Sequence, residues 1–302
     1  MSGHAIPQPG GVTLREATQP QQQTSERRRI LRRFMRYKPG LVGLGIIILL
    51  VTLAVFAPWI APYSPEEINT PLRGASPSSN YWLGNDDIGR DILSRLIYGS
   101  RIALIVGIGA TAIAVTIGVT VGALAGYFGG KVDFILSRLV DTLMAFPLLA
   151  LLLTLSSVFG PSLRNVVVVI GLTVWASYAR LVRAEVLSLR ERDFVLAARA
   201  SGAGDRRIIF RHIVPNALGP VIVIASLAVG GVIILESALS FLGLGVSRPT
   251  ASWGTMLSDG REYIRNYPHI AIAPGVAITI TVLSFNLVGD GLRDALDPRQ
   301  RE

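Results

Sequence analysis

An uncharged stretch runs from Ile102 to Gly130 and contains no Asp, Glu, Lys, Arg or His. A helix of this length exceeds the roughly 20 residues that cross the hydrocarbon core of a bilayer, so it can span one with a tilt. Inside a bilayer only helices and closed barrels satisfy all backbone hydrogen bonds. The stretch therefore predicts a transmembrane helix, and it requires the rest of the chain to fold around a membrane.

Further apolar runs repeat this signal along the chain. They cover 41–60, 139–159, 165–181, 216–239 and 270–288, with Pro147 and Pro274 as expected kinks. The first run follows a basic stretch, but it is too long for a signal peptide and lacks a cleavage site. Val166–Ile170 has strand propensity, yet its neighbours favour a membrane helix. The sequence thus predicts an all-α, polytopic membrane protein with six transmembrane helices.

Composition agrees with this prediction and excludes several kinds of site. Half of the residues are hydrophobic and 16% are charged, against about 25% charged in soluble domains. There is no cysteine, so disulfides and thiol nucleophiles are excluded. The histidines His4, His212 and His269 are too scattered to indicate a metal site. The net charge of +9 does not indicate nucleic-acid binding, because the basic residues lie beside apolar spans.

The basic residues predict an orientation. The N-terminal arm, the 131–138 connector, the 180–215 loop and the C-terminal tail hold seven, two, eight and three basic residues, whereas the opposite segments hold eight in all. The positive-inside rule then places both ends in the cytoplasm of a cell-membrane protein. We expect a disordered tail (1–25), a basic arm with the first span (26–61), an outer loop (62–98), a five-helix transmembrane domain (99–290) and a cytoplasmic tail (291–302).

The loop within 185–215 is the most strongly charged segment between the spans. Phe194, Val195 and Ala198 predict an apolar stripe on a short helix. Gly202 and Gly204 can both adopt positive φ and turn the chain. A second short helix is expected after them; Asp205 is its expected N-cap, Ile208, Ile209, His212 and Ile213 its apolar face, Arg206, Arg207 and Arg211 its basic face, and Pro215 the start of a new helix.

The same loop resembles the EAA motif of ABC importer permeases, which reads Glu-Ala-Ala, three residues, Gly, nine residues, Ile-x-Leu-Pro. Ala197, Ala198, Gly202 and Pro215 match it at the required spacing. Leu196, His212 and Val214 depart from it, standing where the motif has Glu, Ile and Leu. The alternative interpretation, from charge alone, is a basic loop on the membrane surface.

Two further segments resemble the peptide and nickel permease branch of this family. Trp82–Leu96 is similar to its Leu-Gly-Thr-Asp-x-x-Gly-Arg-Asp segment, with Asn85 in place of Thr. Residues 285–298 are similar to its Phe-Asn-x-x-Gly-Asp-Gly-Leu-Arg-Asp-x-Leu-Asp-Pro terminus. Without the resemblance, the residue types of 285–298 predict a helix that is capped by glycine and stopped by Pro298.

The resemblance implies a type I ABC importer permease fold and a pore subunit for dipeptides or oligopeptides. It implies a homologous permease as partner, two ATPase subunits that bind ATP and magnesium, and an extracytoplasmic binding protein. The ATPases would contact the motif loop, with Ala197, Ala198, Gly202 and Pro215 in the contact and Arg206, Arg207 and Arg211 adding ion pairs. Nickel and glutathione remain alternative substrates.

Charged and small residues within the spans give further candidates. Glu236 is an isolated acid near the outer end of an apolar run, so it is a candidate for the translocation pathway or a partner of an outer-loop arginine. Asp141 is a second pathway candidate, with Arg138 three residues earlier as its expected ion-pair partner. The glycines at every fourth position clear one helix face for packing; they are Gly118, Gly122 and Gly126.

The outer loop contains an acidic and basic cluster for which we expect a solvated, self-paired surface helix: Asp86, Asp87, Arg90 and Asp91. No phosphate-binding Gly-x-x-x-x-Gly-Lys-Ser/Thr motif occurs, so the chain is not expected to hydrolyse ATP or to hold a cofactor. No zincin or nucleophile-elbow motif occurs either. A self-contained secondary transporter and a membrane scaffold remain rival interpretations; the former usually shows internal repeats, which we do not find.

Overall fold

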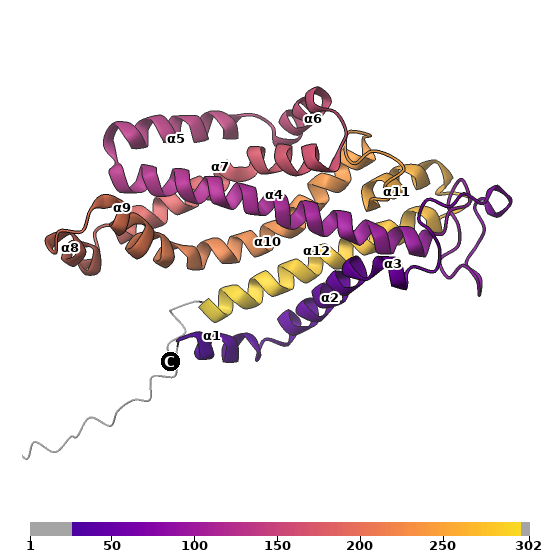
Figure 1. The fold of residues 1–302 in the computed structure, drawn as a ribbon, viewed down its shortest axis with the longest axis horizontal. Coiled ribbons are helices and arrows are strands. Elements are labelled where there is room, and N and C mark those ends of the chain that lie inside the picture. The colour runs from indigo at the N-terminus through magenta and orange to yellow at the C-terminus, as the bar shows by residue number, and fades with distance from the viewer. Residues whose placement is uncertain (1–25, 297–302) are drawn as a thin grey trace, which may run out of the picture.

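The computed structural model describes residues 26–296, which form a bundle of helices elongated along one axis (Figure 1). The predicted disordered tail (1–25) and Pro298 lie outside the described residues. The helices are α1 (Glu26–Phe34), α2 (Lys38–Val55), α3 (Ala57–Ile60), η1 (Thr70–Leu72), α4 (Ile92–Phe128), α5 (Gly130–Ala145), α6 (Leu148–Phe159), α7 (Leu163–Leu189), α8 (Asp193–Ala200), α9 (Asp205–Arg207), η2 (Ile208–Ile213), α10 (Val214–Phe241), α11 (Trp253–Gly260), η3 (Arg261–Tyr263) and α12 (His269–Leu296).

Within this part of the chain there is no β-strand, so the all-α prediction is confirmed. Five helical segments are long and apolar enough to cross a membrane: α2, α4, α7, Asp205–Phe241 and α12. A sixth span arises if α5 and α6 count together, since they are bent by 89° at a short break. Pro147 lies at that break, and proline cannot continue the helical hydrogen-bond ladder. The predicted kink is therefore a sharp bend.

The two ends of the bundle carry different structures (Figure 1). The loop 61–91, α11 and the start of α4 gather at one end, and α8 with α9 lie at the opposite end. The long helices connect these ends, and the pair α4–α7 makes the most extensive contact among them. The loop predicted to couple to an ATPase and the predicted outer loop are thus separated by the length of the bundle.

Two helix boundaries differ from the sequence prediction. Helix α4 begins at Ile92, about ten residues before the uncharged stretch, because Asp91 caps it by accepting a hydrogen bond from the backbone N–H of Ser94 at 2.8 Å. Helix α12 continues to Leu296, so Gly289 and Gly291 are helical rather than C-caps. Gly291 instead allows close contact, because an added Cβ would lie 2.9 Å from the ring of Phe34 on α1.

The glycines spaced by four on α4 face α7. An added Cβ on Gly122 would lie 2.5 Å from the carbonyl oxygen of Ala179, and on Gly126 it would lie 2.9 Å from that of Arg183. Gly118 lies against Tyr178 in the same way. Contacts this short leave no room for a side chain. The small-residue face therefore brings the two helix backbones together within this chain.

Candidate functional site

The segment between α7 and α10 turns back on itself at the end of α8. Gly202 has φ +77°, which favours glycine, and its N–H donates to the carbonyl of Arg199 at 3.0 Å. The N–H of Ala203 donates to the carbonyl of Ala198 at 3.1 Å. These two bonds form a Schellman cap that stops α8 and reverses the chain. Positive φ is thus confirmed for Gly202, but wrong for Gly204, whose φ is −70°.

The second half of the segment is not a separate short helix. Residues Asp205–Phe241 form one continuous helical segment, with a π-helical stretch, η2, just before Pro215. Pro215 is the second residue of α10 (Val214–Phe241), as predicted, and the π-helical stretch joins α10 to the residues before it without a break. The predicted N-cap is also wrong, because Gly204 occupies that position and Asp205 makes no capping bond.

One face of this segment is buried on the bundle. Val195 of α8 and Ile208, Ile209 and Ile213 of η2 pack in one hydrophobic cluster with Val182 and Val186 of α7. His212, expected on the same face, is half-buried. Burial of these aliphatic side chains holds α8 and the start of the 205–241 helix against the ends of α4 and α7. The loop is consequently a packed elbow and not a free strand of chain.

The opposite face of this elbow is open. Ala197 is exposed, Ala198 is half-buried at the edge of the hydrophobic cluster, and Phe210 is 59% exposed. A groove there is lined by Arg206, Arg207, Phe210, Arg211 and Pro215 among others. An exposed aromatic ring and small side chains within a rim of arginines are the features of a protein-docking surface. We call the exposed part of residues 197–215 the elbow surface; it excludes the buried side chains of Ile208, Ile209 and Ile213.

A polar link joins the elbow to α4. The hydroxyl of Tyr127, at the end of α4, donates to Asp205 Oδ1 at 2.6 Å, and the guanidinium of Arg199 lies 5.9 Å from the centre of the Tyr127 ring. Arg190 Nη1 donates to the carbonyl oxygen of Gly126 at 3.1 Å. This link could not be predicted from the sequence, because no local pattern connects Tyr127 with Asp205, which is 78 positions away.

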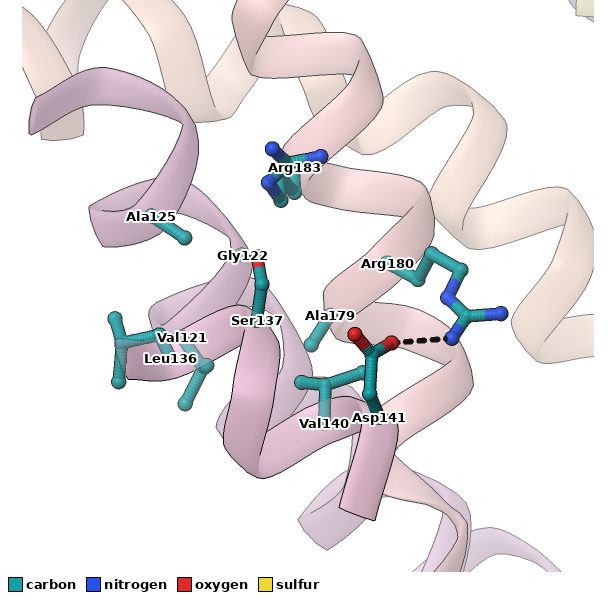
Figure 2. A pocket seen from close by; sticks show the side chains of 10 residues that line it. All are labelled: Val121, Gly122, Ala125, Leu136, Ser137, Val140, Asp141, Ala179, Arg180 and Arg183. Atoms are coloured by element: carbon teal, nitrogen blue, oxygen red, sulfur yellow. Dashed lines mark hydrogen bonds and ion pairs between the residues drawn. The ribbon is translucent and has the colours of Figure 1, made fainter. Parts of the chain in front are cut away.

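Helix α5 is attached to α7 by two ion pairs. Arg180 Nη2 donates to Asp141 Oδ1 at 2.8 Å, drawn as a dashed line in Figure 2. The predicted Arg138 partner of Asp141 is wrong: the guanidinium of Arg138 lies over the ring of Phe134 instead, at 5.6 Å. Arg183 pairs with Asp133. Both acids of α5 therefore form their ion pairs with arginines of α7, and not with an arginine of α5.

Glu236 is buried inside the chain with about 1% of its surface exposed. Its Oε1 accepts a hydrogen bond from Ser240 at 2.7 Å and its Oε2 one from Ser237 at 3.3 Å. The expected pairing with an outer-loop arginine is wrong, since no ion pair to Glu236 occurs among residues 26–296. Within this chain the carboxyl group therefore faces the hydroxyl groups of Ser237 and Ser240, and its place on the translocation pathway stays a prediction.

The charged cluster of the 61–91 loop is buried, in contrast to the expected solvated surface helix. Asp86 binds Arg90 at 2.7 Å and also Arg95, and Asp259 of α11 contacts both arginines at 3.2 and 3.5 Å. Arg248 pairs with the second oxygen of Asp259. The sequence indicated the self-pairing, but not Asp259, which is more than 160 residues away. This ionic cluster joins the loop to α11.

The family-model comparison identifies the chain's relatives. The model described as the inner membrane component of binding-protein-dependent transport systems matches residues 118–302. The chain belongs to this family of ABC importer permeases. A second model, the N-terminal transmembrane domain of oligopeptide transport permease C, matches residues 25–77 of the permease and places it in the C-type branch.

Curated relatives support the same assignment over nearly the full length. The permease is 43% identical to the dipeptide transport system permease DppC of Alkalihalophilus pseudofirmus, covering 91% of this chain and 90% of that protein. It is 42% identical to the oligopeptide transport system permease OppC of Bacillus subtilis, covering 89% and 88%. It is 44% identical to the nickel transport system permease NikC of Escherichia coli K12, covering 85% and 93%.

A solved structure shows the same fold. The permease superposes on a chain from the inward-facing MetNI methionine ABC transporter with a TM-score of 0.55 and 19% identity, covering 67% of this chain and 96% of that one. The type I importer permease fold predicted from sequence is therefore confirmed. At this identity the likeness concerns the fold alone.

Proposed function

We propose that this permease forms the translocation pathway of an ATP-driven peptide importer, together with a homologous permease subunit. The resemblances to DppC and OppC at 42–43% identity support peptides as the substrate class. NikC and the glutathione permease GsiD are related to a similar degree, so nickel and glutathione are the competing substrates. An extracytoplasmic binding protein delivers the substrate.

The observation that carries this proposal is the elbow surface. Two ATPase subunits bind and hydrolyse ATP, and one of them docks on this surface, where Ala197, Ala198, Gly202 and Pro215 form the contact. Arg206, Arg207 and Arg211 are exposed there and can pair with acidic residues of the ATPase. Because the buried face of the elbow packs on α4 and α7, a movement of the ATPase is passed directly to these helices.

The distribution of basic residues supports the orientation. The elbow and the end of α12 lie toward the end of the bundle that we assign to the cytoplasm, with both chain termini on the cytoplasmic side of the cell membrane. The ionic cluster and the 61–91 loop then lie outside. Alternating access follows when ATP closes the ATPase pair and the spans rock against those of the partner permease.

Reconstitution tests the proposal. The permease is co-expressed with its partner permease, ATPases and binding protein, purified, and placed in liposomes with labelled dipeptide, nickel or glutathione. We expect peptide uptake that requires both ATP and the binding protein. Uptake by this chain alone, driven by an ion gradient, would contradict the proposal. Uptake of nickel or glutathione without uptake of peptide would show that the permease belongs to an importer of that compound and not of peptides.

A further inference from the structure

A cavity of about 240 Å³ lies between α4, α5 and α7. Figure 2 shows its lining: Gly122, Ala125 and Ala179 present almost no side chain, whereas Ser137, Asp141 and Arg180 present polar groups. The volume equals that of roughly eight water molecules at about 30 Å³ each. The cavity is thus large enough for the end of a short peptide, and its small walls let a ligand approach the helix backbones.

Asp141 and Arg180 show what kind of surroundings the open side of the cavity has. Asp141 and Arg180 belong to spanning segments, yet their side chains are 53% and 56% exposed in this chain. Charged side chains within a bilayer avoid lipid and face water-filled cavities or protein. The open side of the cavity therefore borders an aqueous route or the partner permease.

The two ion pairs at the cavity differ in how firmly they are held. Asp133 receives two bonds from Arg183, Nε to Oδ1 and Nη2 to Oδ2 at 2.7 Å, and a third from Ser137 at 3.0 Å. Asp141 receives a single bond from Arg180, and both side chains are more exposed. Bidentate pairs are geometrically fixed, whereas exposed single-bonded pairs are weak. One pair fixes α5, and the other can open.

We propose that this cavity is a subsite of the translocation route that receives the charged ends of a zwitterionic peptide, with the peptide carboxylate on Arg180 and its ammonium on Asp141. The exchange is electrically neutral, because one protein ion pair is replaced by two pairs to a ligand without net charge. The guanidinium supplies further donors for the carboxylate, and Asp141 Oδ2 is available to the ammonium. This inference rests on the proposed function and names how its substrate is recognised.

Thiol labelling tests this directly, because the chain has no native cysteine. Ser137→Cys places a thiol in the cavity of the reconstituted complex, and a charged methanethiosulfonate probes its exposure to water. We expect labelling that Ala-Ala with free termini slows about tenfold when present at ten times its Kd. Ala-Ala with both termini blocked should give no protection. Thr142→Cys, a neighbour that does not line the cavity, should be labelled equally with and without peptide.

Charge variants complete the test. In the Ser137→Cys background, Asp141→Asn and Arg180→Gln should abolish the protection, whereas Asp141→Glu should retain part of it. Absence of labelling in every nucleotide state, or equal protection by the blocked peptide, would overturn the subsite. So would full protection in both neutral variants. Uptake by the parent complex separates the two failures: ATP-driven Ala-Ala uptake without protection removes the subsite alone, and absent uptake removes the peptide function itself.

Discussion

Asp259 is the residue on which the outer end of the molecule depends most. Its carboxylate is 2% exposed and contacts Arg90, Arg95 and Arg248, which come from the 61–91 loop, α4 and the segment before α11. A buried charge is tolerated only when it is paired, because removing it from water is costly. Arg90 and Arg95 are buried and depend on such pairing, whereas Arg248 is exposed. The cluster therefore fixes the 61–91 loop and α11 relative to α4.

We predict that Asp259→Asn destabilises the permease strongly. Breaking a buried pair by removing one partner typically costs about 3–5 kcal/mol. The thermal unfolding midpoint of the purified complex measures this. Glu262→Gln is the matched control, since Glu262 is exposed in the neighbouring η3 and should leave the midpoint unchanged. Equal midpoints for both variants would show that the cluster is not a stabilising junction.

The stability of the permease depends on pH through Asp87. Burial, and then the nearby charges of Asp86 and Asp259, raise the pKa of Asp87 above its ordinary value of 3.8. A carboxyl group with a raised pKa binds its proton more tightly in the folded state, so stability falls as pH rises from about 3.8 through the folded pKa. Asp87→Asn should raise the unfolding midpoint at pH 7, and the gain should shrink toward pH 4. A gain that grows on acidification would contradict this sign.

The ion-pair partners of individual charged residues could not be predicted from the sequence. The charges of Asp141, Asp86 and Arg90 were visible in the sequence. Their partners, which are Arg180, Arg95 and Asp259 in that order, depend on which helices lie side by side. Short-range spacing favoured Arg138 for Asp141, and tertiary packing selected Arg180 instead. Positive φ was predicted for both Gly202 and Gly204, and only Gly202 adopts it, at +77°, because it is the residue that caps α8.

At the scale of elements, the α4–α7 contact depends on glycine. We predict that Gly122→Ala destabilises the permease by about 1–3 kcal/mol, because the new Cβ would meet the Ala179 carbonyl at 2.5 Å and separate the helices. Gly231→Ala is the control, with no atom within 4 Å of the added Cβ, and it should be neutral or stabilising by about 0.5–1 kcal/mol. Unfolding midpoints of the two variants compare them, and a milder effect at Gly122 would contradict the close contact.

The link between the elbow and α4 predicts an effect on coupling. Tyr127→Phe removes the hydroxyl that donates to Asp205 and keeps the ring under Arg199. If the elbow drives α4 through this bond, more ATP should be hydrolysed per peptide transported, while the complex stays assembled. Tyr98→Phe, at the other end of α4, is the control. An unchanged ratio of ATP to peptide would assign the bond to stability alone.

Elements were predictable where apolar length decided them. The runs near 41–60 and 165–181 became α2 and α7, because long apolar segments in a bilayer have few alternatives to a helix. Pro215 is the second residue of α10, as predicted, but the π-helical stretch before it makes Asp205–Phe241 one continuous helical segment, which the sequence did not predict. The 89° bend at Pro147 was foreseen as a kink but not in size, because the angle depends on what α6 packs against.

For the whole molecule, the sequence predicted the fold class, and the relatives and the MetNI fold agree with it. The basic face of the elbow was predicted, but the burial of the charged cluster at the other end was not. The ionic cluster fixes one end with buried charges, while the elbow presents Phe210 and a basic rim at the other. Under the proposed coupling to an ATPase, the ionic cluster would hold one end of the bundle fixed while the elbow surface is driven at the other.

Cross-linking from a single cysteine measures the central claim most directly. Ala197→Cys places the only thiol of this chain on the elbow surface, and Trp82→Cys places one on the exposed outer loop as a control. With a short thiol-to-amine cross-linker in the assembled complex, we predict an adduct between Ala197→Cys and an ATPase subunit, and none from Trp82→Cys. Modification of Ala197→Cys by a membrane-impermeant reagent added outside intact cells, with no ATPase adduct, would contradict the account.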